Sequence, residues 1–198
     1  LPHISNFTDV EWLRVRWIDA PGSRWYTHVI IPGTKNTTGD LAWLRERGLD
    51  LWIREQHAAG AVVIGVCGGY QILGETVSEN GLSHAGLGML PVQTTMTSEK
   101  IVRRVRAKST AGAEFDAYEI HMGVTAVNGS APFAYVNGSA EGARANGCLG
   151  TYLHGALQDS GVCSELGLKL QASRTDYDAL AQWFEANANV KCFEELYL

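Results

Sequence analysis

The stretch AVVIGVCGGYQILGETV, residues 61–77, decides the expected fold because an apolar run leads directly into a cysteine among glycines. Residues 61–66 have the continuous apolar character of a strand that is covered on both faces. Residues 70–77 can form a short helix. Cys67 would then stand on a sharp turn between strand and helix, where glycine neighbours permit strained dihedral angles. The stretch therefore predicts a strand-turn-helix unit that presents a thiol.

The segments before this stretch supply further elements of the same kind. Alternation of apolar and polar residues predicts a strand over 11–19, and the β-rich run 28–33 predicts another. Leucine, isoleucine and tryptophan recur at helical spacing over 37–60, with Gly48 as a break, which predicts two short helices. Strand and helix in alternation indicate a parallel sheet with helices on its faces.

The middle of the chain changes character. Residues 90–96, 100–107 and 115–122 are β-like with no helical pattern between them, which predicts antiparallel strands at a sheet edge. The words VNGSA at 127–131 and 136–140 predict two tight turns, because Asn-Gly favours hairpin turns.

The last part of the chain returns to the first pattern. Residues 147–155 predict a strand that ends in a histidine, and residues 164–173 and 176–197 predict helices. With 198 residues and 45% hydrophobic content, the chain can form one full core. We therefore expect a single α/β domain over 1–198, a three-layer sandwich with a mostly parallel central sheet and antiparallel additions at its edge.

Composition argues against several classes of partner. The formal net charge is −5 and the basic residues are scattered, so the sequence offers no patch for nucleic acid or for an anionic membrane. No run approaches the roughly 18 apolar residues of a spanning helix. Four separated cysteines without a CxxC pair (Cys67, Cys148, Cys163 and Cys192) and no export signal indicate reduced thiols and a cytoplasmic location.

Cys67 is the candidate nucleophile. Its predicted place at a helix N-terminus stabilises a thiolate, and the backbone N–H of Gly68 can face a developing oxyanion. The alternative reading is a small buried cysteine packed beside glycines. His154 is the candidate base, because it also follows a predicted strand and the ends of parallel strands converge on one edge. A buried structural histidine is equally compatible with that pattern.

The other titratable residues give weaker signals. His121 stands in an alternating segment and is either functional or part of a polar strand face, while structural or surface roles are expected for His3, His28, His57 and His84. No cluster of His, Cys or carboxylate residues has metal-ligand spacing, so no metal site is expected.

GVCGGYQILG resembles the class I glutamine amidotransferase signature G-x-C-x-G-x-Q. Taken with LPHISNFTD, IPGTKNTTGDLAWLRERGLD, YEIHMG and GTYLHG in this order, it resembles the C-terminal glutaminase domain of the cobyric acid synthase family. This resemblance extends from residue 2 to about residue 155. It implies hydrolysis of glutamine to glutamate, with the ammonia delivered to an ATP-dependent ligase that amidates corrinoid carboxylates in cobalamin biosynthesis.

The resemblance also implies roles for particular residues. Cys67 would form a γ-glutamyl thioester and His154 would carry the proton. Gly33 and Gly68 would supply the N–H groups of an oxyanion hole. Gln71 would lie near the substrate, and Glu119 and His121 would help to form its pocket. No cofactor is implied for this part, because ATP and Mg²⁺ would bind to the ligase domain, in cis or in trans.

Two departures from the family pattern stand out. Position 156, two residues after His154, is Ala where class I amidotransferases usually carry Glu, so a Cys-His dyad is implied. Val124 and Thr125 follow YEIHMG, where an Arg or similar polar residue is usual. The phosphate-binding Gly-x-x-x-x-Gly-Lys-Ser/Thr loop of the ligase domain is absent from these residues, so we expect the chain to be part of a larger enzyme.

Other readings stay open at this point. One is the glutaminase subunit of a cell-wall amidating ligase, which shares CGGYQ. Another is a degenerate amidotransferase domain that acts as a docking or regulatory module, although the presence of both Cys67 and His154 disfavours decay. Cysteine proteases and esterases on related folds would lack a glutamine-specific pocket.

Overall fold

A computed structural model of the chain describes residues 4–5, 10 and 13–170. The helices are α1 (Thr37–Glu46), α2 (Leu49–Ala58), α3 (Gly68–Leu73) and α4 (Ser160–Glu165), with a 3₁₀ turn, η2, at Ala156–Gln158. The strands are β1 (Ile4–Ser5), β2 (His28–Ile31), β3 (Gly33–Thr34), β4 (Val62–Val66), β5 (Thr76–Glu79), β6 (Leu82–Ala85), β7 (Val92–Ser109), β8 (Glu114–Val127), β9 (Ala134–Val136), β10 (Ser139–Glu141), β11 (Ala143–Ala145), β12 (Cys148–Thr151) and β13 (Leu153–His154).

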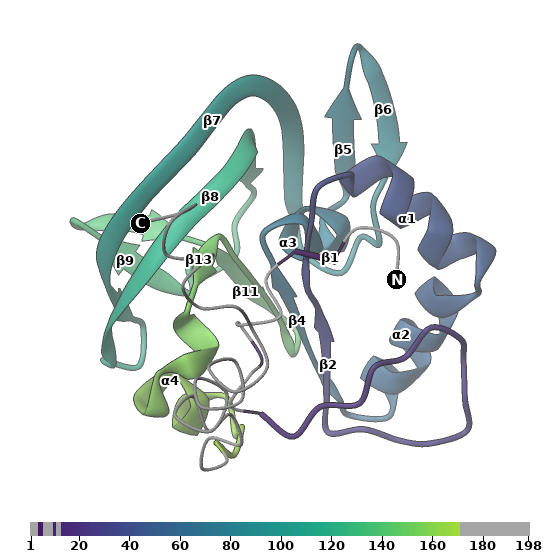
Figure 1. Ribbon diagram of the computed structural model, residues 1–198, viewed down its shortest axis with the longest axis horizontal. Helices are drawn as coiled ribbons and strands as arrows, with labels where there is room; N and C mark the ends of the chain where they lie inside the picture. Colours follow the sequence, from purple (N-terminus) through teal and green to yellow (C-terminus); the bar gives the residue numbers. More distant parts are fainter. Residues whose placement is uncertain (1–3, 6–9, 11–12, 171–198) are drawn as a thin grey trace, which may run out of the picture.

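The predicted parallel sheet is present. Its order is β11-β12-β4-β2, with β12, β4 and β2 parallel and β11 antiparallel at one edge. Strand β4 lies between two parallel neighbours, and Val63 and Ile64 in it are fully buried, as its continuous apolar run predicts. Figure 1 shows α1 and α2 on one side of this sheet and α4 on the other. The α/β class is confirmed.

The two predicted helices before β4 are confirmed. Asn36 caps α1, since its side chain accepts the Gly39 N–H at 3.0 Å. Gly48 separates α1 from α2 with φ 68°, a left-handed conformation that favours glycine. Leu41, Trp52 and Ile53 are buried, so both helices turn an apolar face toward the sheet.

The middle segments form a sheet of their own beside the parallel one. Its main path is β10-β9-β7-β5-β6, and β8 pairs with β7 and with β13. The long hairpin of β7 and β8 arches over the side of the parallel sheet that lies away from α1 and α2 (Figure 1). The inward face of β8 carries Phe115, Ala117 and Glu119, all buried. The side chains on this face of β8 must pack against other residues to be buried. The antiparallel strands therefore cover one face of the parallel sheet and do not lie only at its edge.

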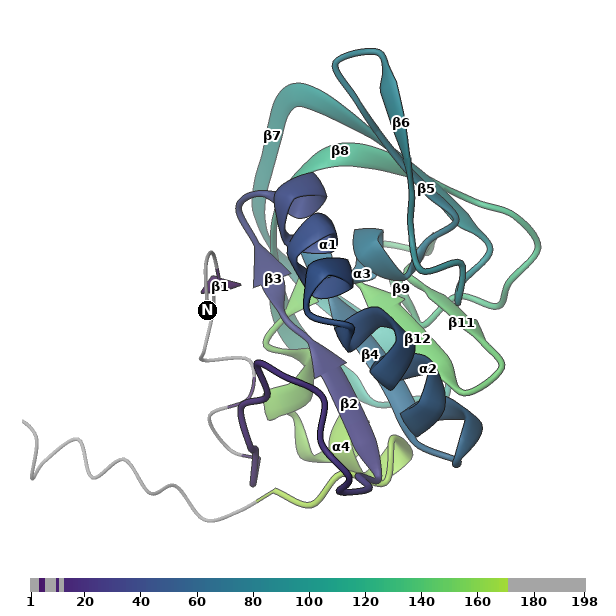
Figure 2. The same cartoon turned by 90° about the vertical axis from the view of Figure 1, so that its right-hand side faces the viewer.

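The prediction of a strand over 11–19 is wrong for residues 13–19, the part of this range that the structure describes. Leu13 makes a single antiparallel bridge to Leu170, and residues 14–18 have no regular structure. Val15 and Trp17 are 42% and 43% exposed, so the alternating residues do not face a core. Figure 2 shows this segment passing outside β2.

Two other predictions need correction. The helix predicted over 164–173 is wrong, because α4 ends at Glu165 and Gly167 follows with φ 68°. The helix predicted over 176–197 lies outside the described residues, which end at Leu170. The second VNGSA word is a hairpin turn, with Asn137 and Gly138 both at positive φ, between β9 and β10. The first is not a hairpin turn, because β8 and β9 do not pair.

Gly150 in β12 shows how tightly the sheet packs against α3. A Cβ atom added to Gly150 would lie 1.9 Å from the ring of Tyr70, which is itself buried. We expect Gly150→Ala to lower the free energy of unfolding by at least about 1–3 kcal/mol, because the ring has no free space to move into. Denaturant titration measures this change. Gly22→Ala is the control, since nothing lies within 4 Å of a Cβ there; equal stability of the two variants would contradict the packing described.

Candidate active site

Cys67 stands at the carboxyl end of β4 in a strained backbone conformation. Its φ is 54° and its ψ is −112°, a region that non-glycine residues rarely adopt. Its N–H donates to the Thr151 carbonyl oxygen at 2.8 Å, which fastens the turn to the neighbouring strand β12. Gly68 begins α3, and the first N–H groups of a helix have no partner within it. The turn therefore presents a thiol beside backbone donors, as a nucleophile elbow does.

Three glycines around Cys67 permit this turn. A Cβ on Gly65 would lie 2.5 Å from the Gly69 carbonyl oxygen, and a Cβ on Gly69 would lie 2.0 Å from the Ile31 carbonyl oxygen. At Gly68, a Cβ would lie 2.3 Å from the Thr34 methyl group. A side chain at Gly68 or Gly69 would push the elbow away from β2 and β3, and one at Gly65 would push the start of α3 away from β4.

Cys67 and His154 both approach strand β8. The predicted strand 147–155 is in fact two strands: β12 ends at Thr151, and the chain then crosses to the other sheet as β13. His154 pairs there with Tyr118 of β8, and the Cys67 thiol donates to the carbonyl oxygen of Ile120 on the same strand at 3.4 Å. His154 is fully buried and stacks on the Tyr118 ring at 5.1 Å between centroids. Both candidate catalytic residues thus lie against residues 118–120.

Gln71 is buried, and its side-chain amide is held by the protein. Its Oε1 accepts from the Thr37 hydroxyl at 2.8 Å. Its Nε2 donates to the Met122 carbonyl oxygen at 2.9 Å and to the Tyr152 hydroxyl at 3.1 Å. Gln71 therefore ties α3 to α1 and to β8, and its contact with a substrate stays a prediction.

Glu119 and His121 lie on the inward face of β8. Glu119 is buried, with its side chain 4% exposed, and forms an ion pair with Arg103, whose side chain is 56% exposed. His121 stacks on Tyr152 with 3.7 Å between ring centroids, and no described residue pairs with its buried Nδ1. Burial lowers the pKa of His121 below its usual value, although the Glu119 charge opposes the shift. Burial therefore favours the neutral form of the His121 imidazole.

Gly33 lies in β3, which packs on the elbow. A Cβ on Gly68 would lie 2.9 Å from the Thr34 backbone nitrogen, so β3 brings its amide groups alongside the start of α3. Gly33 itself pairs with Ser5 of β1. The structure thus brings together the two segments expected to form an oxyanion hole, whose donors stay a prediction.

Sequence reasoning missed three residues around the site. Thr151 and Tyr152 connect β12 to β13, and the Tyr152 hydroxyl also bonds to the Thr125 hydroxyl at 2.6 Å. Burial raises the pKa of Tyr152 to about 12. Glu141, at the end of β10, accepts hydrogen bonds from Thr151 and Tyr152. Thr151 and Tyr152 were within the quoted GTYLHG block, whereas nothing in the sequence around Glu141 marks it.

Comparison with known proteins agrees with this geometry. Residues 1–162 match the model of the CobB/CobQ-like glutamine amidotransferase domain. The chain belongs to this family. It is 41% identical over 178 residues to a cobyric acid synthase of Desulforudis audaxviator (strain MP104C), covering 79% of this chain and 36% of that protein. It is 39% identical over 206 residues to a cobyric acid synthase of Jannaschia sp. (strain CCS1), covering 92% of this chain and 42% of that protein.

The same comparisons show how much of each relative this chain corresponds to. The chain spans about two fifths or less of the length of these curated relatives. Two solved structures share its fold: one described as a glutamine amidotransferase (TM-score 0.58, 17% identity, covering 70% of this chain and 76% of that one) and PurLQS from Thermotoga maritima (TM-score 0.58, 14% identity, covering 81% and 87%). The chain is a glutamine amidotransferase domain with the expected α/β fold.

The two departures from the family pattern can now be placed in this amidotransferase domain. Ala156 is buried in η2, so position 156 offers an apolar methyl group where the usual carboxylate would stand. Val124 is exposed on β8, whereas the Thr125 hydroxyl bonds to Thr94 at 2.8 Å as well as to Tyr152. Thr125 therefore belongs to the scaffold of the site.

The other cysteines in the described part of the chain are Cys148 and Cys163. Cys148 and Cys163 are buried free thiols whose pKa burial raises to about 11, and Cys192 lies outside the described residues. In the described part of the chain no group of three His, Cys, Asp or Glu side chains could hold a metal ion. No described helix is both long and apolar enough to cross a membrane.

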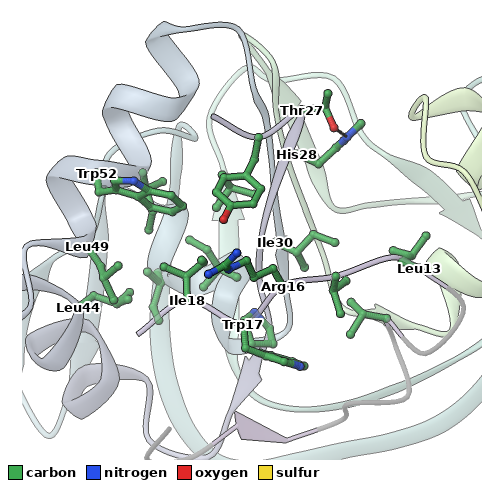
Figure 3. A pocket seen from close by; sticks show the side chains of 18 of the residues that line it. Leu13, Arg16, Trp17, Ile18, Thr27, His28, Ile30, Leu44, Leu49 and Trp52 are labelled. Atoms are coloured by element: carbon green, nitrogen blue, oxygen red, sulfur yellow. Dashed lines mark hydrogen bonds between the residues drawn. The ribbon is translucent and has the colours of Figure 1, made fainter. Parts of the chain in front are cut away.

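A large apolar cavity lies apart from Cys67. It has a volume of about 870 Å³ and runs between the irregular segment 13–18 and the helices α1 and α2. Figure 3 shows Leu44, Leu49 and Trp52 on one side, Leu13 on the other, and Trp17 and Ile18 between them. Neither Cys67 nor His154 lines it, although its wall reaches β3. Because the candidate nucleophile and base lie outside this cavity, the elbow defines the candidate site.

The strained turn gives a direct test at Cys67. We expect Cys67→Gly to be more stable to unfolding than Cys67→Ala by about 1 kcal/mol, because glycine relieves the positive φ. Denaturant titration compares the two. At Cys148, in a regular strand of the same sheet, the order should reverse, since glycine in a strand costs about 0.5–1 kcal/mol relative to alanine. Alanine as the more stable residue at both positions would contradict the strain described.

Proposed function

We propose that the chain hydrolyses glutamine to glutamate and ammonia through a Cys-His dyad. The Cys67 thiolate attacks the carbonyl carbon of the glutamine side-chain amide. The tetrahedral intermediate collapses to a γ-glutamyl thioester and breaks the bond to nitrogen. His154 takes the thiol proton and gives it to the departing ammonia. It then removes a proton from the water that attacks the thioester, and glutamate and the free thiol result.

The observation that carries this proposal is the strained elbow at Cys67. The backbone stores about 1–3 kcal/mol of strain there, which a merely structural cysteine would not need. Strand β3 packs against the start of α3, which supports the assignment of the Gly68 N–H and an N–H from β3 as oxyanion donors; one such donor would contribute about 3–4 kcal/mol. His154 supplies an imidazole from the strand that pairs with β8, where the Cys67 thiol makes its hydrogen bond.

The substrate pocket in this proposal is formed around β8. Glu119 and His121 give its inward face a carboxylate and a neutral imidazole, and Gln71 holds that face in place through Met122. The glutamine amino group would meet the acidic side of this face. Specificity for glutamine would then separate the domain from proteases and esterases that use a similar elbow.

The names of the relatives support a proposal for the fate of the ammonia. The two quoted relatives are named cobyric acid synthases, and the chain corresponds to less than half of each. We propose that the ammonia passes to an ATP-dependent ligase part, in cis or in trans, that amidates corrinoid carboxylates in cobalamin biosynthesis. ATP and Mg²⁺ would bind there and not in this domain. The cytoplasmic location belongs to the same proposal.

Glutamate release from glutamine tests the reaction. Cys67→Ala should abolish turnover, by more than about 10³-fold, because no other group can form the thioester. A glutamine-mimicking electrophile should add one adduct at Cys67, detectable by mass spectrometry, and none in the variant.

Cys163→Ala is the matched control, since Cys163 is a buried thiol outside the site. It should keep both turnover and labelling. Absence of turnover and of labelling in the unaltered chain, also after the ligase part is added, would overturn the enzyme proposal in favour of a docking module.

A further inference from the structure

One carboxylate holds the turn that links the two catalytic residues. Glu141, the last residue of β10, accepts the Tyr152 N–H on Oε1 at 2.7 Å and the Thr151 hydroxyl on Oε2 at 2.7 Å. The Thr151 hydroxyl oxygen in turn accepts the Leu153 N–H at 3.0 Å. Glu141 thus lies outside the turn and accepts hydrogen bonds from two consecutive residues within it, Thr151 and Tyr152.

The anchored turn touches the nucleophile on one side and carries the base on the other. The Thr151 carbonyl accepts the Cys67 N–H at 2.8 Å, and the His154 N–H donates to the Tyr152 carbonyl at 3.2 Å. Both contacts fall within the four residues 151–154. A shift of the turn would therefore change the distance between the thiol and the imidazole, and a misplacement of about 1 Å can cost a factor of about 10² in rate.

We propose that Glu141 is a positioning residue for the glutaminase reaction, which as a carboxylate fixes the turn 151–154 and so aligns His154 with Cys67. This role rests on the proposed function. The family's usual carboxylate after the histidine is replaced by Ala156, which is buried. Glu141 differs from that carboxylate because it acts on the backbone and the Thr151 hydroxyl.

The charge of Glu141 changes near neutral pH. Burial raises the pKa of its carboxyl to about 7, against the opposing effect of the hydrogen bonds from Tyr152 and Thr151. The charged or titratable groups that face it are Tyr70 of α3, Tyr152, and Glu119 with its partner Arg103. Burial also raises the pKa values of both phenols far above 7, so they stay neutral. A cavity of about 190 Å³, lined by Tyr70, Ser130, Glu141 and Tyr152, lets protons reach the carboxyl.

Protonation would weaken the anchor. A carboxylate offers acceptors to both Tyr152 and Thr151, whereas a carboxylic acid places a donor on one oxygen, opposite a donating hydroxyl. Because the pKa is raised, the carboxylate form, and the alignment with it, is gained as pH rises through about 7 and lost below it.

The test compares Glu141→Gln with the unaltered chain in glutaminase kinetics. Since the amide nitrogen of Gln cannot accept, we expect kcat to fall about 10- to 100-fold while KM changes less than about 3-fold. The step in kcat with a midpoint near pH 7 should vanish. Glu79→Gln is the matched control, because Glu79 also accepts a threonine hydroxyl, from Thr38 at 2.8 Å, but on β5. It should keep both kcat and the step.

A second measurement does not depend on turnover. The amide resonance of Tyr152 in ¹⁵N–¹H spectra should titrate with a midpoint near pH 7, and this titration should be absent in Glu141→Gln. Thr151→Val should lose kcat as Glu141→Gln does, and Thr151→Ser, which keeps the hydroxyl, should retain it within about 3-fold. If Glu141→Gln does not fold, the comparison of Thr151→Val with Thr151→Ser tests the positioning role of Glu141.

The outcomes separate the two proposals. Unchanged kcat and an unchanged pH step in Glu141→Gln, or equal kcat in the two Thr151 variants, would overturn the positioning role and leave the glutaminase reaction intact. Absence of turnover in the unaltered chain with its ligase part would count against the reaction itself. The Tyr152 titration would then still show whether Glu141 controls the turn.

Discussion

The close approach of backbone to backbone around Cys67 is the constraint on which the rest of the structure depends. Gly65, Gly68 and Gly69 each lie so near a neighbouring segment that no Cβ fits. The strain at Cys67, about 1–3 kcal/mol, persists because moving the turn would expose β4. Val63 and Ile64 are fully buried there, and each contributes about 1.5–3 kcal/mol through burial. The position of the thiol is therefore set by the packing of the sheet.

A second constraint joins the two sheets. Gln71, Tyr152 and Thr125 form a chain of hydrogen bonds that also reaches Thr37 and Thr94, and most of these groups are buried. An unsatisfied buried polar group costs about 1–3 kcal/mol, so the sheets cannot slide past each other without a large penalty. The signature glutamine of the family has this scaffold role whether or not it also touches substrate. It holds β8 over the elbow.

Features that depend on a short stretch of sequence were predicted from the sequence. The apolar run of β4, the helical spacing of α1 and α2, and the glycines at the elbow identified the parallel sheet and Cys67. The strand predicted over 11–19 failed because alternation indicates two faces but not a partner strand. The separate antiparallel sheet and the crossing at Thr151 depend on pairing between distant residues. Glu141 carries no motif, because its role arises only where β10 meets the turn 151–154.

The placement of His154 shows how packing can orient an imidazole in this fold. The ring is fully buried and one of its faces stacks on Tyr118, whereas position 156 offers only the methyl group of Ala156. Glu119 is next to Tyr118 on β8, but its charge is already paired with Arg103. The turn 151–154 carries the ring, so its rigidity contributes to the precision of the site, and a carboxylate that holds this turn can influence catalysis without touching the imidazole.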